Sequence, residues 1–407
     1  MIADRMRQAR LAAGMTLDEV ARHMESLGHP ITRAGLSKYE KNKSTPGQAF
    51  LAALGKVLQV KTSFFLSEPS VSIEWLAFRK QARMPQSRQE QVKALAAQVV
   101  EAQVWLQRTL YPNERPSFPK PARAHSVEDA ERAAQDLRAA WKLGDAAIGS
   151  LTRLLEDRGG IVVAHGGVQT EREFDGLAGW ADHTTPIAVV STNVPDDRLR
   201  YNLAHELGHL LMDCPDLDPK EEESLAHRFA SALLIPAAVI RRELGARRRR
   251  VAMREFAILK GKCGLSMQGS VRRAFDLGII EESQYKALFA QFSQFGWRKS
   301  EPYPYAGDEK PARLLQMTVR AFTEGIITRE RAEQVCPGCT TAMPGQPDER
   351  VQPISASALR KLPREQRDAI LAAAAKEAED EYLGNRELTD FEAFSEEDVD
   401  DQDEGPQ

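Results

Sequence analysis

Residues 201–211 read Tyr201-Asn202-Leu203-Ala204-His205-Glu206-Leu207-Gly208-His209-Leu210-Leu211. The apolar residues of this stretch recur at helical spacing and predict a largely buried helix. His205 and His209 are four residues apart, so they share one helical face and can bind one zinc ion together. Glu206 is turned from His205 by about 100°, where it can contact a metal-bound water without being a ligand. Because zinc lowers the pKa of such a water towards about 7, a carboxylate there can act as a general base.

A second helix with an acidic start follows the motif and supplies a candidate for the third zinc ligand. It reads Glu221-Glu222-Glu223-Ser224-Leu225-Ala226-His227-Arg228-Phe229-Ala230. A catalytic zinc site needs three protein ligands and an open fourth position. The alternative interpretation, a surface helix with two incidental histidines, does not account for the apolar context or for this second helix.

Together with Phe229-Ala230-Ser231-Ala232-Leu233-Leu234-Ile235-Pro236, these two stretches resemble the ImmA/IrrE family of metallopeptidases, which are similar to reduced thermolysin-type zincins. The resemblance implies that Glu223, which opens an E-x-x-A pattern, is the third ligand rather than Glu221 or Glu222. Where the family usually has Asn or Asp, this chain has His227. On the face of Glu223, His227 is either a partner of the ligands, an extra ligand, or a surface or packing histidine.

The similarity continues in Leu265-Ser266-Met267, in Arg272-Arg273-Ala274-Phe275-Asp276-Leu277-Gly278-Ile279-Ile280, and in Gly296-Trp297-Arg298 with Glu301-Pro302. These segments resemble the long bacterial members of the family, which carry an N-terminal DNA-binding domain. The likeness covers about residues 5 to 335.

The N-terminal 70 residues show the spacing of short packed helices. Thr16 and Glu19 form a capping-box pattern at the start of the second helix. Residues 16–21 followed by 31–46 resemble the lambda-repressor-like (XRE) helix-turn-helix, in which the third helix presents its N-terminal face to the major groove. A helical bundle used only for protein contacts is the alternative.

The expected DNA contacts divide into base readers and phosphate contacts. Those on the exposed face of the third helix are Thr32, Arg33, Ser37 and Lys38, and those that follow it are Lys41, Asn42 and Lys43. Arg33 has the geometry to bind a guanine edge, and the later residues are placed for phosphates. Residues 1–70 carry 10 basic and 6 acidic side chains, a net charge of +4. This charge is modest, so we expect a homodimer on a double-stranded operator.

The composition sets the broad class of the protein. The chain has 407 residues, of which 42% are hydrophobic, 28% charged and four are cysteines. No apolar run spans a membrane and no signal-peptide core opens the chain, so we expect a cytoplasmic protein without a disulfide framework. Residues 377–407 carry a charge of −13, which leaves +9 on residues 1–376. A basic body with an acidic tail fits a nucleic-acid partner, although the tail is equally explained as a solubility aid.

We therefore predict a mainly α chain with a small α+β core. The domains are a five-helix helix-turn-helix bundle at 1–70, a helical connector with a Pro-rich linker at 71–125, and a minimal zincin-like domain at 126–300. A helical region at 301–380 and a disordered acidic tail at 381–407 follow. Short strands are expected at 161–164, 176–180 and 187–190, and a long helix around 92–106.

Other candidates are weaker. Cys336 and Cys339 form a lone CxxC, which suits a surface turn better than a zinc half-site or a redox pair. The four arginines at 247–250 indicate a solvated helix end, with phosphate contact as the alternative. His165 and His183 lie near the predicted strands and are weak candidates for stabilising an oxyanion.

The sequence as a whole predicts a bacterial transcriptional regulator with a zinc-dependent peptidase domain. The resemblance implies that the domain hydrolyses a peptide bond in a repressor-type protein, and the chain itself and a paralogue are among the candidates for that substrate. A non-proteolytic transcription factor whose zincin-like domain senses a ligand or partner is the alternative. A peptidase whose helix-turn-helix only recruits a substrate is a third interpretation.

Overall fold

The computed structural model describes residues 2–68, 70–76, 84–116, 118–165, 176–341 and Arg367. The predicted acidic tail at 381–407 lies outside the described residues, as does most of 301–380 beyond residue 341. Within the described part the chain is mainly helical with a small mixed sheet, as the sequence predicts.

The N-terminal residues form the predicted bundle of five helices. These are α1 (Ile2–Ala12), α2 (Leu17–Ser26), α3 (Arg33–Glu40), α4 (Gln48–Leu58) and α5 (Thr62–Leu66). The predicted capping box is confirmed, because Thr16 accepts a hydrogen bond from the Glu19 amide and Glu19 accepts one from the Thr16 amide. Their apolar faces enclose a separate core that includes Met6, Val20, Met24, Leu36, Leu54 and Phe65.

The described strands of the main sheet are β1 (Ile73–Trp75), β3 (Ile161–His165), β4 (Gly176–Ala181) and β5 (Thr185–Ser191), in the order β1-β4-β5-β3. The β3–β5 pair is parallel and the other pairs are antiparallel. The three strands expected from the sequence are confirmed, whereas β1 was not anticipated. A second, two-stranded sheet joins β2 (Ala122–Arg123) to β6 (Met212–Asp213).

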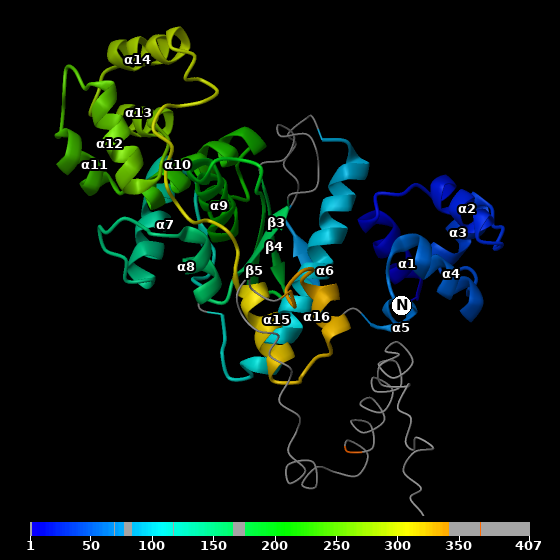
Figure 1. Cartoon of the computed structure of the whole chain (residues 1–407). Coiled ribbons are helices and arrows are strands. Elements are labelled where there is room, and N and C mark those ends of the chain that lie inside the picture. The colour runs from blue at the N-terminus through cyan, green and yellow to red at the C-terminus, as the bar shows by residue number, and fades with distance from the viewer. Residues whose placement is uncertain are drawn as a thin grey trace, which may run out of the picture. The chain divides into compact units, whose positions relative to one another are not determined.

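Side chains that alternate along the strands give the main sheet two apolar faces. In Figure 1 the strands lie between α6 and α9. One face, which includes Ile161, Val163 and Ile187, packs on the long helix α6 (Gln86–Leu110). The opposite face, which includes Val162, Ala188 and Val190, belongs to the core shared with α9 (Asp196–Leu211). The period of two residues in a strand explains this division. This face of the sheet therefore packs against α9.

Helices α7 (Val127–Ala140), α8 (Leu151–Asp157) and α10 (Pro219–Leu234) complete the layer around α9. The chain continues through α11 (Ala237–Leu244), α12 (Met253–Cys263), α13 (Met267–Asp276) and α14 (Glu282–Gln294). The described part of the predicted C-terminal helical region holds α15 (Arg313–Thr323) and α16 (Arg329–Val335).

No single helix among the described residues is both long and apolar enough to cross a membrane. One bent pair, α10 with α11, passes by length and composition alone and turns by 62° at its break. Phe229, Ala230, Leu233 and Ile240 of this pair are buried in the main core, which accounts for its apolar composition.

Candidate metal centre and DNA-binding module

Two helices that lie in close contact, α9 and α10, carry the candidate metal ligands. Gly208 lies at this contact, where a Cβ would be 3.2 Å from Phe229 and 3.3 Å from the Cα of Ala226, a tight fit. A glycine inside a helix costs stability, and here it permits the close approach of the two helices. The same turn of α9 thereby places its two histidines against Glu223 of α10.

His205, His209 and Glu223 come together as the sequence predicts. One ligand atom from each lies within 4.8 Å of the others. The two Nε2 atoms are 3.1 Å apart, and Glu223 lies 3.1 Å from His205 and 3.6 Å from His209. Two imidazoles and a carboxylate are the donor set that a catalytic zinc site uses. The residues present therefore fit a zinc ion.

Hydrogen bonds from His205 and His209 hold the pKa of Glu223 far below its ordinary value, although partial burial opposes the shift. Glu223 is thus ionised at neutral pH. An anionic carboxylate beside two imidazole nitrogens is ready to coordinate a cation without first losing a proton.

Glu206 lies beside these three residues and packs against the sheet. A Cβ added to Gly176, the first residue of β4, would lie 2.3 Å from the Oε1 atom of Glu206. The strand backbone thus approaches the carboxyl group closely. Glu206 is buried, with an exposed fraction of 7%, and it is absent from the cluster of potential ligands among the described residues. This position suits a base rather than a ligand.

Three further side chains surround the cluster. Glu222, which the sequence analysis set aside as a ligand, lies 3.5 Å from Nδ1 of His209 and so can orient that ring. His227 lies 3.7 Å from Glu223, and its Nδ1 is 3.0 Å from the hydroxyl of Tyr201. The sequence argument singled out His227 but missed Tyr201, whose position four residues before His205 was the available signal.

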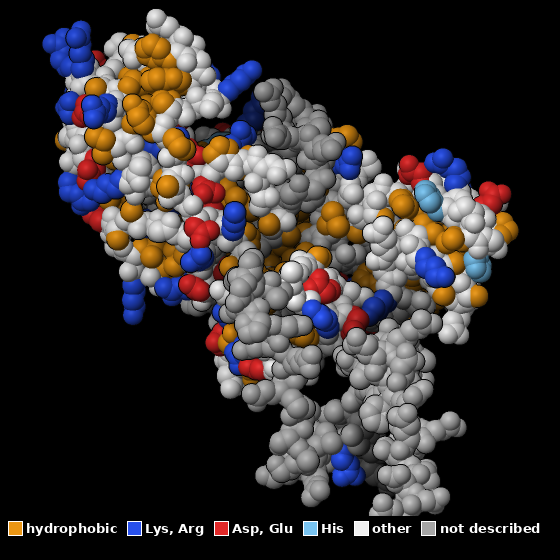
Figure 2. All heavy atoms as spheres, viewed as in Figure 1, with side chains coloured by type: hydrophobic (Ala, Val, Ile, Leu, Met, Phe, Trp, Pro, Cys, Tyr) orange, Lys and Arg blue, Asp and Glu red, His pale blue; other side chains and the backbone are white. Residues whose placement is uncertain are grey.

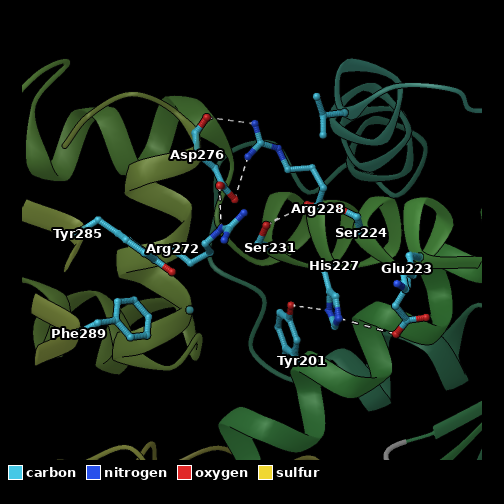
Figure 3. A pocket seen from close by; sticks show the side chains of 13 residues that line it. Tyr201, Glu223, Ser224, His227, Arg228, Ser231, Arg272, Asp276, Tyr285 and Phe289 are labelled. Atoms are coloured by element: carbon cyan, nitrogen blue, oxygen red, sulfur yellow. Dashed lines mark hydrogen bonds and ion pairs between the residues drawn. The ribbon is translucent and has the colours of Figure 1, made fainter. Parts of the chain in front are cut away.

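Burial raises the pKa of Tyr201 well above its ordinary value, so its phenol stays protonated and can donate a hydrogen bond. Together with His227 and Glu223, Tyr201 lines a cavity of about 590 Å³ that extends from the cluster towards α13 and α14 (Figure 3). Cavities of this size accommodate small ligands or short peptide segments.

The predicted DNA-contact residues lie at the N-cap of α3, within the helix and directly after it. Arg33 is well exposed and pairs with Asp18 at 3.2 Å across the turn. Lys38 is exposed and Ser37 half-buried. Thr32 is the N-cap of α3 and accepts a hydrogen bond from the Gly35 amide, so its hydroxyl already has a structural role. Beyond the helix, Lys41, Asn42 and Lys43 are all exposed.

The weaker candidates stand apart from the metal cluster. Glu333 accepts hydrogen bonds from the Gly338 and Thr340 amides and so shapes the turn that holds Cys336 and Cys339. Burial raises the pKa of both thiols. Among the described residues they belong to no group of three potential metal ligands.

Two arginines of the run, and one of the two histidines near the strands, have acidic partners. Arg247 and Arg248 pair with Glu281 and Glu255. Figure 2 shows this part of the surface, over α11 and α12, with acidic side chains among the basic ones. His183 is exposed and lies 3.3 Å from Glu74. His165 ends β3, and its side chain is outside the described part.

Comparison with known families agrees with both modules. Residues 6–65 match the family model described as helix-turn-helix, and residues 165–260 match the one described as IrrE N-terminal-like domain of the M78 peptidases. The chain thus joins an XRE-type helix-turn-helix to an IrrE/ImmA-like metallopeptidase domain. The second match contains β4, β5 and the two helices that carry the cluster, α9 and α10. No curated protein matches the chain.

Proposed function

We propose that this protein is a transcriptional regulator that binds an operator through residues 1–70 and hydrolyses a peptide bond in a repressor-type protein. The observation that supports the proposal is the convergence of His205, His209 and Glu223 within 4.8 Å, with Glu206 beside them. The helix-turn-helix match supports a DNA-binding regulator, and the second match supports a metallopeptidase-like domain.

In this proposal His205, His209 and Glu223 hold one zinc ion. When bound, the ion would act as a Lewis acid that polarises the scissile carbonyl group. It would also lower the pKa of a water molecule, so that the water can lose a proton and attack the carbonyl carbon. Glu206, held against Gly176, accepts the proton of the attacking water and then delivers it to the leaving amine. Tyr201 is a protonated phenol at the edge of the same cavity, where it can donate a hydrogen bond to the substrate.

The second candidate function is regulation without proteolysis. The fusion to a helix-turn-helix favours it, because the output of the protein is then control of transcription whether or not a bond is cut. In that case the zincin-like domain senses a ligand or a partner. The homodimer and the cytoplasmic location remain parts of the proposal, as do the domain boundaries.

One pair of variants separates the two functions. Glu206→Gln keeps the shape of the side chain and all three ligands, so it is expected to retain about one zinc per chain and to lose peptide cleavage. Glu223→Ala removes a ligand and is expected to lower the zinc content. Metal analysis and a promoter reporter are measured on both variants.

A peptidase predicts that both variants lose the regulatory output. If the domain is a sensor, we expect normal regulatory output from Glu206→Gln and loss of that output in Glu223→Ala. This result would refute the proteolytic mechanism. If carefully prepared wild-type protein holds no zinc, the metal site itself is wrong.

A further inference from the structure

A continuous series of ion pairs runs from the interior of the domain to the wall of the cavity. It starts at Arg273, whose Nη2 donates to Glu131 at 2.8 Å. Glu131 also lies 2.7 Å from Arg228, and Arg228 lies 3.0 Å from Asp276. Asp276 then accepts a hydrogen bond from Nε of Arg272 at 2.8 Å. Three arginines thus alternate with two carboxylates, and the series carries one positive charge in excess.

The excess charge lies at the cavity end of the series. The side chain of Arg273 is 0% exposed, that of Arg228 is 13% exposed and that of Arg272 is 61% exposed. Each of the two inner arginines contacts Glu131, and Arg228 also shares Asp276. Arg272 has only its share of Asp276 within the series. Because a charge without a full counter-charge is least costly where water reaches it, Arg272 presents the excess charge to the cavity.

The wall beside Arg272 is aromatic. Tyr285 and Phe289 of α14 line the same cavity, with their ring centroids 4.6 Å apart. Tyr285 and Arg272 lie next to each other in the lining of the cavity (Figure 3). Lys220 and Arg228 are the other two cations of the lining, which also contains the carboxylates of Asp276 and Glu223. A planar guanidinium binds a carboxylate through paired hydrogen bonds, and aromatic rings provide apolar contact for the methylene groups that carry it.

The cavity also reaches the candidate catalytic residues, since Tyr201, Glu223 and His227 form its other end. A peptide that places its scissile bond at the metal cluster therefore has one side along this wall. We propose that the cavity is the subsite for an acidic side chain, Glu or Asp, of the peptide substrate near the scissile bond, with Arg272 as its specificity-determining residue. This inference rests on the proposed peptidase function and names its substrate class.

Binding rather than turnover provides the test. The full-length Glu206→Gln protein, loaded with zinc, is titrated with short fluorescent peptides that are identical except for Glu, Gln or Lys at one position. The Glu peptide is expected to bind about threefold to tenfold more tightly than the Gln peptide. Salt is expected to narrow this difference, because the interacting charges are partly exposed.

Arg272→Ala in the same background is expected to abolish the preference for Glu, and Arg272→Glu to reverse it in favour of Lys. Arg247→Ala is the matched control, because Arg247 is an exposed arginine paired with Glu281 and does not line the cavity. It should keep the preference. Circular dichroism shows whether each variant is folded, and the charge reversal gives a gain of binding that a misfolded protein cannot give.

Equal binding of the Glu and Gln peptides to the starting protein would overturn the inference, as would a preference that survives Arg272→Ala. Cleavage by the wild-type protein is scored separately. A preference for Glu without cleavage supports the carboxylate subsite and counts against the peptidase. Cleavage without a preference for Glu supports the peptidase function and refutes the carboxylate subsite.

Discussion

At the scale of single residues, the contact between Gly176 and Glu206 gives a test that leaves the metal ligands in place. In Gly176→Ala the new Cβ would lie 2.3 Å from the Glu206 carboxyl oxygen, so the carboxyl group must move. Displacing a catalytic group by about 1 Å can cost about a hundredfold in rate. We expect peptide cleavage to fall by at least about tenfold, measured as kcat/KM, with unchanged zinc content.

Gly261→Ala serves as the control for this change, because no atom lies within 4 Å of the added Cβ. It is expected to leave both cleavage and zinc content unchanged. Loss of zinc in Gly176→Ala would show that Glu206 supports the ligands rather than acting as the base.

The DNA module offers a second residue-scale prediction. Arg33 is well exposed on α3, where a guanidinium can read a guanine edge, so Arg33→Ala is expected to weaken operator binding by about tenfold and to reduce sequence preference. Lys43→Ala is expected to weaken all sequences alike and to flatten the salt dependence. Titrations of operator and scrambled DNA at several salt concentrations measure both. An equal loss on both DNAs in Arg33→Ala would make Arg33 a phosphate contact.

The residue spacing explains which parts of the site were predictable. His205, Glu206 and His209 share one helix, so their relative directions follow from helical geometry. Gly176 precedes Glu206 by 30 residues in the sequence, and the two come into contact only because β4 packs against α9. Nothing local marks Gly176. The series that ends at Arg272 was hidden for the same reason, since Glu131 and Arg273 come from α7 and α13.

At the scale of elements, buried carboxylates from distant segments cap helices by accepting hydrogen bonds from the amides at their N-termini. Glu309 is fully buried and accepts hydrogen bonds from the amides of Leu151 and Thr152 at the start of α8. It also lies 3.6 Å from Arg200, which is itself fully buried. Glu301 accepts the amides of Met267 and Gln268 at the start of α13 in the same way. These acceptors satisfy donors that a helix start leaves unpaired.

Removing the carboxylate of Glu309 is therefore expected to lower the stability of the fold. Glu309→Ala removes the carboxylate paired with the buried Arg200 and the acceptor of two amides. We expect the free energy of unfolding to fall by about 3–5 kcal/mol, measured by urea denaturation. The neighbouring Asp308→Ala is the control, because the Asp308–Arg153 pair is exposed and is worth less than about 1 kcal/mol. Similar losses in the two variants would refute the capping role.

Periodicity and capping patterns predicted the helices of the bundle, the long helix and three strands, because these signals lie within each element. The caps from Glu301 and Glu309 could not be predicted in this way. Their partners are more than 30 residues away in the chain, and an acidic residue in a Pro-containing break looks solvated. The strand β1 is short and its pairing with β4 depends on the fold as a whole.

At the scale of the whole molecule, α6 contacts both functional modules. The sequence suggested a connector, yet one face of α6 packs Val92, Val100 and Val104 into the core of the sheet. From the same helix, Glu101 pairs with Arg5 of α1 at 2.8 Å. The side chain of Arg5 is only 3% exposed, and it also donates to the carbonyls of Ser67 and Glu68. Arg5 thereby joins the two ends of the DNA module to α6.

Glu101→Ala tests whether this contact stabilises the DNA module. The change leaves the buried guanidinium of Arg5 without its carboxylate, which costs about 3–5 kcal/mol of stability when no other group compensates. Because two carbonyls still accept hydrogen bonds from Arg5, we expect the free energy of unfolding to fall by about 1–3 kcal/mol. The loss should appear as faster hydrogen exchange in α1 and α5, while zinc affinity stays unchanged because the cluster lies on α9 and α10. Glu90→Ala is the matched control: Glu90 is on the same helix but pairs only locally with Lys93 at 3.6 Å among the ion pairs of the described residues. Unchanged exchange in α1 after Glu101→Ala would mean that the bundle is stabilised by its own core alone, and that α6 transmits nothing to it through Arg5.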